Sequence, residues 1–192
     1  MSLDEKMFIR TNEHYLRKVA KRRIAHSKRV AAICREIVSE LECEFDIDTD
    51  LLYCAAQVHD IRKLEENKKH HKKARKALKK ELGDEITPKE LKQVCRVISE
   101  HKGKKFEPEK KKIALEAAIL RMADKIDRIE QKKPGAVNDY WESLEKIETY
   151  FGTKKKFFYA YDAFEEACET VRTRRQRIRL FLERGEYNVA HR

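Results

Sequence analysis

Ionisable side chains stand at places in this sequence where a helical pattern calls for apolar residues. They fall on, or directly after, apolar stripes in four segments: His26, His59, Asp60, His101 and Asp124. A buried ionised carboxylate is strongly unfavourable unless it is paired or bound to a metal, and neutral imidazole is a common metal ligand. These residue types together predict a buried site for one or two divalent metal ions.

The mixture of imidazole and carboxylate donors narrows the choice of metal without fixing it. Nitrogen and oxygen donors together suit manganese, iron, nickel or zinc better than calcium, and magnesium alone prefers more oxygen. Taken singly, the residues also have structural interpretations. His101 is typical of a hydrogen-bonded core histidine, and Asp124 of an acid paired with Arg121 or Arg128. The combination in one chain favours the metal site.

The elements that position these residues are predicted to be helices, in a single domain over residues 1–192. The chain has only 5 Gly and 3 Pro, too few turn formers for a β-sandwich or barrel, and 41% hydrophobic residues exclude wholesale disorder. Asp50 is the predicted N-cap of the second helix, and Thr87 with Pro88 opens the fourth. Apolar periodicity predicts helices over about 16–41, 50–61, 70–82, 88–102, 111–130 and 138–150, and a long last helix with a stripe from Phe157 to Leu182.

Composition bounds the compartment and the partners. No apolar run approaches the roughly 18 residues of a membrane span, and the N-terminus lacks the apolar core of a signal peptide, so we expect a cytoplasmic protein without a membrane partner. The 5 Cys are odd in number and scattered, which indicates reduced core residues. The net charge of +11 favours a polyanionic substrate or partner, although the excess Lys is scattered as on a solvated surface.

Five motifs follow one another on the predicted helices. In chain order they are AHSKRVA around His26, VHDIRK with His59 and Asp60, HHKKARKAL with His70 and His71, ISEHKGK with His101, and ILRMADKID with Asp124. Together they resemble the HD superfamily of metal-dependent phosphohydrolases over about residues 14–130. The resemblance implies a compact all-α bundle with a metal site between core helices. A helical extension at about 138–185, which ends in the long C-terminal helix, follows this core.

The resemblance assigns metal ligands residue by residue. Its four basic ligands match His26, His59, Asp60 and Asp124, with Asp60 placed to bridge if a second ion is present. Members with two ions use further histidines, and one such position matches His101. Either His70 or His71 matches the other, and we prefer His70, which lies in line with Ala74 and Ala77.

The resemblance also assigns residues that face the substrate. Lys63 matches a lysine that contacts substrate phosphate, so Asp60 and Lys63 are the predicted catalytic pair. Arg62 departs from the glycine that many members carry there. The predicted phosphate contacts are Arg29, Arg62, Lys63 and Arg121, with Lys125 more typical of a solvated face. Asp127 resembles a recurrent acid that orients a His or an Arg.

The activity implied is hydrolysis by metal-activated water of a phosphate ester or anhydride, in a nucleotide or another small phosphorylated substrate. No nucleophilic side chain is needed, and the sequence has no phosphate-binding P-loop and no nucleophile elbow. HKGK followed by LRMADKIDR is also similar to the C-terminal region of exopolyphosphatase/guanosine pentaphosphatase proteins, which adds polyphosphate as a substrate class.

Other functions remain open at this level. One is an HD-type nuclease, or a protein that binds nucleic acid or polyphosphate, because the last helix is rich in arginine. Another is a regulatory protein of the same fold without turnover, which Arg62 permits and in which the long last helix serves a homodimer. The arginines are Arg172, Arg174, Arg175, Arg177 and Arg179.

Overall fold

Helices form nearly all of the structure, a computed structural model that describes residues 21–41, 45–60, 78–79, 86–101, 115–152 and 158–183. These ranges contain no strand, which confirms the predicted all-α fold. The helix predicted at 70–82 lies outside the described residues apart from a helical pair at 78–79. The main helices are α2 (Lys21–Glu40), α3 (Thr49–Val58), α5 (Pro88–Glu100), α6 (Leu115–Glu130), α7 (Ala136–Gly152) and α8 (Phe158–Glu183).

Local capping sets where two of these helices begin. In α5, Thr87 Oγ1 accepts from Glu90 N at 3.2 Å while Glu90 Oε2 accepts from Thr87 N at 2.7 Å, so the predicted start is confirmed. The prediction for α3 is wrong, because Asp48 rather than Asp50 is the N-cap: Asp48 Oδ1 accepts from Leu51 N at 3.0 Å. Aspartates stand at every second position here, at 46, 48 and 50. Asp50 lies in the first turn of α3, where its negative charge interacts favourably with the helix dipole.

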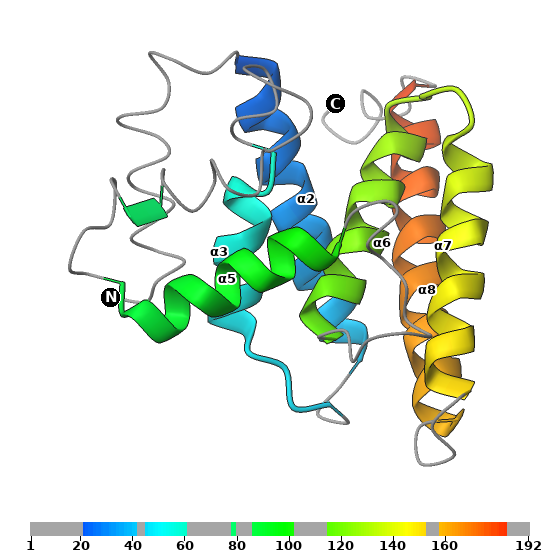
Figure 1. The fold of residues 1–192 in the computed structure, drawn as a ribbon. Coiled ribbons are helices and arrows are strands. Elements are labelled where there is room, and N and C mark those ends of the chain that lie inside the picture. The colour runs from blue at the N-terminus through cyan, green and yellow to red at the C-terminus, as the bar shows by residue number, and fades with distance from the viewer. Residues whose placement is uncertain are drawn as a thin grey trace.

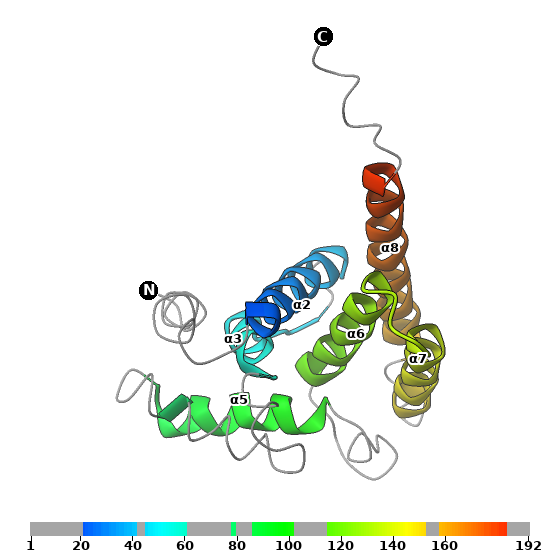
Figure 2. The same ribbon diagram turned by 90° about the horizontal axis from the view of Figure 1, so that it is seen from above.

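Helix α6 is the central element of the bundle. It packs against all five of the other helices, and α2 additionally contacts α3 and α8. Figures 1 and 2 show α2, α3 and α5 on one side of α6, with α7 and α8 side by side on the other. Any polar side chain on the inner face of α6 is therefore surrounded by protein. No helix in the described ranges has the length and apolar character needed to cross a membrane.

The apolar stripes of the sequence form the core. Val30, Ile33 and Ile37 of α2 are buried, as are Phe164 and Val171 of α8. Described free cysteines occur at Cys34, Cys54 and Cys168, which are buried, and at Cys95, which is half-buried. They agree with the expected reduced core residues, and Cys43 lies outside the described residues.

The connection from α6 to α7 is a tight, hydrogen-bonded turn. Lys133 N donates to Arg128 O at 3.0 Å and Lys132 N donates to Ile129 O at 2.9 Å, the two bonds of a Schellman motif. Lys132 takes a φ of 49° at the position where glycine is usual. Gly135 has a φ of 69°, and its carbonyl accepts from Asp139 N as α7 begins. The turn fixes the backbone path from 131 to 135.

Candidate metal centre

The predicted ligands that the structure describes converge between four helices. His26 lies in α2, Asp124 lies in α6, and His101 caps the end of α5. His59 caps the end of α3, and Asp60 follows it. The imidazole rings of His26 and His59 have centroids 5.1 Å apart, and those of His59 and His101 are 5.3 Å apart. Residues separated by almost a hundred positions in the sequence thus form one cluster.

The spacing of the donor atoms fits a shared metal ion. His26 Nε2 lies 3.3 Å from Asp124 Oδ1 and 3.7 Å from Asp60 Oδ2. His59 Nε2 lies 3.9 Å from Asp124 Oδ1 and 4.0 Å from Asp60 Oδ1. Donors that bind one ion at about 2.1 Å stand about 3 to 4 Å from one another in tetrahedral or octahedral geometry. Ligand atoms from His26, His59 and Asp60 can all lie within 4.8 Å of one another, so these residues fit a divalent ion.

Backbone carbonyls set the tautomers of two histidines. Nδ1 of His59 donates to Ala56 O at 2.7 Å, and Nδ1 of His101 donates to Ile98 O, also at 2.7 Å. A carbonyl only accepts, so the lone pair of each neutral ring is on Nε2. These Nε2 atoms are buried and make no hydrogen bond within the described part of the chain. Imidazole with its lone pair on the inner nitrogen is the form that binds a metal.

Asp127 holds His26 from the opposite side. Its Oδ2 accepts from His26 Nδ1 at 2.7 Å, which directs His26 Nε2 toward Asp60 and Asp124. The same carboxylate accepts from Arg29 Nε at 2.5 Å through Oδ1 and from Arg29 Nη2 at 3.3 Å through Oδ2. Asp127 is only 2% exposed. It therefore orients a candidate metal ligand, His26, and an arginine, Arg29, together.

The electrostatics of the cluster follow from these contacts. Burial raises the pKa of Asp124, but the hydrogen bond from His26 and the nearby His59 outweigh it, so this pKa lies well below its usual range. Burial similarly opposes ionisation of Asp127, yet His26 and Arg29 lower its pKa. Burial lowers the pKa of His26, and hydrogen bonds to Asp124 and Asp127 more than reverse this and raise it to about 9. Both carboxylates are ready to neutralise a cation.

A family comparison covers this centre. The HD domain family model matches residues 23–129, more than half of the chain and every residue of the cluster. The chain belongs to the HD domain family. Neither the search of curated proteins nor the search of solved structures finds a match. The predicted family is confirmed, and the similarity to exopolyphosphatase proteins stays a prediction. Membership in this family implies relatedness to metal-dependent phosphohydrolases, and the donor set agrees with it.

The cluster of His26, His59, Asp60, His101 and Asp124 is called the HD centre below. Three of its residues line a cavity of about 690 Å³, the HD cavity, and this volume is within the range of about 300 to 1,000 Å³ typical of small-molecule sites. Among its lining residues Asp60 is buried and His26 and Asp124 are half-buried, whereas Gln131, Lys133 and Pro134 are exposed and mark its mouth. The remaining lining residues, from α2 and from the end of α6, are Ala25, Arg29, Asp127 and Arg128. The cavity thus joins an acidic centre to a basic mouth.

The predicted phosphate contacts lie in different surroundings. Arg29 lines the cavity beside the HD centre. Arg121 is buried. It donates from Nε to Ser143 Oγ at 3.1 Å and from Nη1 to His101 O at 3.0 Å, and these hydrogen bonds join α6 to α7 and to the end of α5. Lys125 Nζ lies 3.6 Å from Asp139 Oδ2. The predicted residues Arg62, Lys63, His70 and His71 lie outside the described residues.

The sequence-based predictions did not include the residues at the mouth of the cavity. Arg128 figured only as a partner for Asp124, whereas in the structure its Nη1 pairs with Asp139 Oδ2 at 2.6 Å. Gln131, Lys133 and Pro134 stand in the segment QKKPG, which breaks the helical pattern. In the sequence, this segment indicates only that a helix ends. A helix end does not reveal which cavity it borders.

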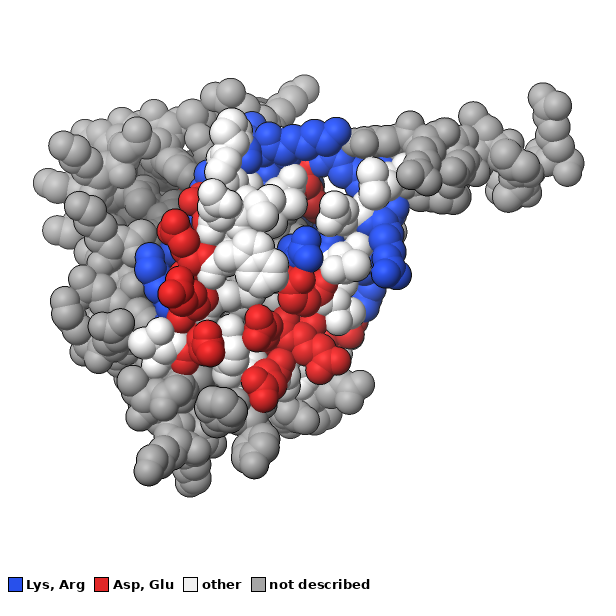
Figure 3. Space-filling model, turned by 90° about the vertical axis from the view of Figure 1, so that its right-hand side faces the viewer, with Lys and Arg blue, Asp and Glu red and all other residues white. Residues whose placement is uncertain are grey.

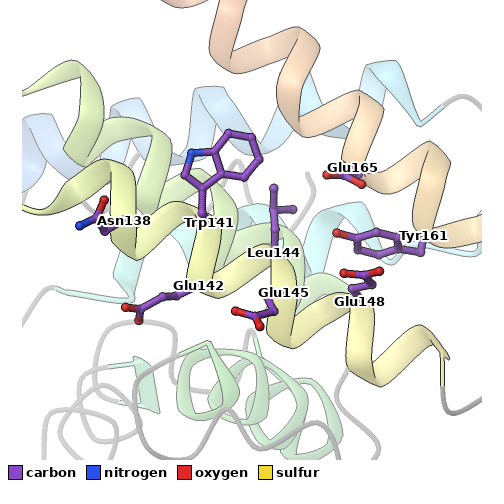
Figure 4. A pocket seen from close by; sticks show the side chains of 8 residues that line it. All are labelled: Asn138, Trp141, Glu142, Leu144, Glu145, Glu148, Tyr161 and Glu165. Carbon is purple, nitrogen blue, oxygen red and sulfur yellow. The ribbon is translucent and has the colours of Figure 1, made fainter.

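A second cavity, of about 450 Å³, lies between α7 and α8 and has a different chemistry. Figure 4 shows Trp141 and Tyr161 among four glutamates, Glu142, Glu145, Glu148 and Glu165. No histidine lines it. Acidic side chains also gather over the wider α7–α8 face (Figure 3). This surface lies outside the residues that match the HD domain.

Proposed function

We propose that this protein is a metal-dependent phosphohydrolase that cleaves a phosphate ester or anhydride in a nucleotide or another small phosphorylated molecule. The observation that carries the proposal is the set of imidazole and carboxylate donors at 3.3 to 4.0 Å from one another at the inner end of a cavity. Membership in the HD domain family supports the same reaction class.

The residues of the centre have distinct roles in this proposal. His26, His59, Asp60 and Asp124 would hold the ion, with His101 beside His59 as a further donor. When bound, a divalent ion would lower the pKa of water toward neutrality, which supplies hydroxide to attack phosphorus, and would polarise a phosphoryl oxygen. Asp127 accepts from His26 Nδ1 and so keeps Nε2 directed at this place, where a bound metal ion would take the position of the Nε2 proton.

Arg29 is the described residue best placed to stabilise charge on the phosphoryl group. Asp127 engages its Nε and Nη2, which fixes the guanidinium at the cavity wall next to His26. Nη1 is the guanidinium nitrogen that Asp127 does not engage, and it is available to a phosphoryl oxygen that gains negative charge during attack. From the resemblance to the HD superfamily, we also propose that Lys63 contacts the substrate phosphate.

The contacts of α8 weigh against a nucleic-acid surface there. Arg172 pairs with Glu169, Arg174 with Glu40, and Arg175 with both Glu36 and Glu130. These charges are already neutralised by carboxylates of the same chain. The neighbouring α7–α8 face is acidic and would repel a phosphate backbone (Figure 3). A small substrate that enters the cavity fits the described charges better.

The test combines metal content with turnover. Protein purified without chelator should contain one or two equivalents of a transition metal and should release phosphate from p-nitrophenyl phosphate or from members of a nucleotide panel. Asp60→Ala should lose both the metal and the turnover while its far-UV circular dichroism stays helical. A nucleic-acid substrate in the same panel tests the nuclease alternative. Full activity in Asp60→Ala, or no metal after reconstitution of the wild type, would refute the proposal.

A further inference from the structure

The mouth of the HD cavity carries cations that the metal centre does not use. Arg128 and Lys125 share one carboxylate, Asp139, at 2.6 Å and 3.6 Å. Within the described part of the chain, the ammonium group of Lys133 has no carboxylate partner. Arg29, by contrast, is balanced by the buried Asp127. The rim formed by Arg128 and Lys133 therefore has an excess of positive charge close to the acidic centre.

The turn after α6 holds this rim in place before any ligand arrives. The two Schellman bonds fix the backbone on both sides of Lys132, which adopts a left-handed φ of 49° although it is not glycine. Lys133 O also accepts from Ala136 N at 3.1 Å, which ties the turn to α7. An unusual backbone conformation held by several bonds is a reason to look for function at the adjacent side chains. Here the adjacent side chain that lines the cavity is Lys133.

We propose that the rim of Arg128 and Lys133 is a second anion subsite, and that the substrate carries a second phosphate group besides the one that is hydrolysed. This inference rests on the proposed function of the same cavity. The reacting phosphate needs the ion and Arg29, so it leaves the rim cations unused. A second phosphate brings a charge of about −1.5 to −2, opposite in sign to the excess near the rim, where the cations of Lys125, Arg128 and Lys133 have one carboxylate partner among the described residues, Asp139.

The dimensions of the cavity agree with such a substrate. Asp124 and Gln131 are seven residues apart at the end of one helix, which corresponds to about 10 Å along its axis. The long side chain of Lys133 can reach back toward the centre across part of this length. A cavity of about 690 Å³ has room for both phosphates and a connecting group. The chemical class is a small bisphosphorylated molecule, with the sugar or spacer left open.

The experiment measures inhibition of p-nitrophenyl phosphate hydrolysis by pentane-1,5-diphosphonate and by pentylphosphonate, which differ only in the second phosphonate. In the metal-loaded wild type, the inhibition constant of the diphosphonate should be about tenfold lower, the effect of one charge-assisted hydrogen bond. Lys133→Gln should reduce this ratio severalfold, because only Arg128 of the rim remains, and Lys133→Arg should restore it. Lys132→Gln is the matched control, because the same charge is removed from a residue that does not line the cavity. It should keep the ratio of the wild type.

The outcomes separate this inference from the proposed function. If the wild type hydrolyses p-nitrophenyl phosphate but both inhibitors bind equally well, the second subsite does not exist and the phosphohydrolase proposal stands. The second subsite is likewise refuted if Lys133→Gln and Lys132→Gln change the ratio equally, because the effect is then one of net charge. If the wild type hydrolyses no phosphate compound with any metal, the proposed function is refuted and the inference with it.

Discussion

Asp127 provides the sharpest test of how this centre is built, because it contacts the proposed metal ligand His26 without being a proposed ligand itself. Its two oxygens accept three N–H groups, one from His26 and two from Arg29. Asp127→Asn keeps the size of the side chain but replaces one oxygen by an NH2 group, which only donates. In either orientation of the amide, this NH2 group faces an N–H group of His26 or Arg29, and the hydrogen bond there is lost.

Each orientation harms the centre in a different way. If the amide nitrogen faces His26, it favours the tautomer with the proton on Nε2, and that proton occupies the lone pair a metal would need. If it faces Arg29, the contact at 2.5 Å is lost and the guanidinium leaves its place beside the cavity. Removing such an orienting partner typically lowers metal affinity 10- to 100-fold, which corresponds to about 1.4 to 2.7 kcal/mol.

The assay is competition for Mn²⁺ or Zn²⁺ against a fluorescent chelator, with circular dichroism to verify the fold. Glu130→Gln is the matched control. Glu130 lies on the same helix and accepts from Arg175 Nε and Nη2 at 2.6 Å and 3.1 Å, but it does not line the metal cavity. The control should keep wild-type metal affinity. Folded Asp127→Asn with metal affinity within twofold of the wild type would show that Asp127 does not orient His26.

Three further predictions concern stability. Metal at one hundred times its dissociation constant should stabilise the wild type by about 2.7 kcal/mol, and a chelator should remove this gain, which thermal melts of Asp60→Ala should lack. Arg175→Ala should cost about 1 to 3 kcal/mol in urea unfolding, because it leaves Glu36 and Glu130 without their shared partner; an unchanged midpoint would contradict this. Lys132→Gly should raise the unfolding free energy by about 0.5 to 1 kcal/mol, because glycine adopts its left-handed φ without strain, and a fall in the urea midpoint would speak against that explanation.

The fold, and the gathering of ionisable side chains between its helices, could be predicted because both follow from periodicity. Val30, Ile33 and Ile37 repeat at helical spacing, and the same rule places His26 on their stripe. Asp124 stood out for the same reason, as a carboxylate on an apolar face. Such residues are visible in the sequence because each violates the pattern of its own helix.

Pairing between helices was not visible in this way. Arg121 and Arg29 are both basic residues on helices that carry a ligand, yet one donates to Ser143 in the bundle and the other lines the cavity. Which of these occurs depends on how the helices cross, and periodicity within one helix contains no such information. The start of α3 shows the limit on a smaller scale, since Asp48 and Asp50 offer the same capping chemistry two residues apart.

In the proposed function, helix α6 links the chemistry of the centre to the selection of substrate. Asp124 is a proposed metal ligand, Asp127 orients His26 one turn later, and Arg128 and the following turn form the rim. A helix is rigid over this length, so the distance between the reacting phosphate and the rim is set by the rise per residue and not by a flexible loop. In this proposal the rim and the metal centre use different residues, so a change at one need not change the other. The helix and its hydrogen-bonded turn nevertheless fix the distance between them. Substitutions at Lys133 should accordingly change which phosphate compounds bind well and leave metal affinity as it is.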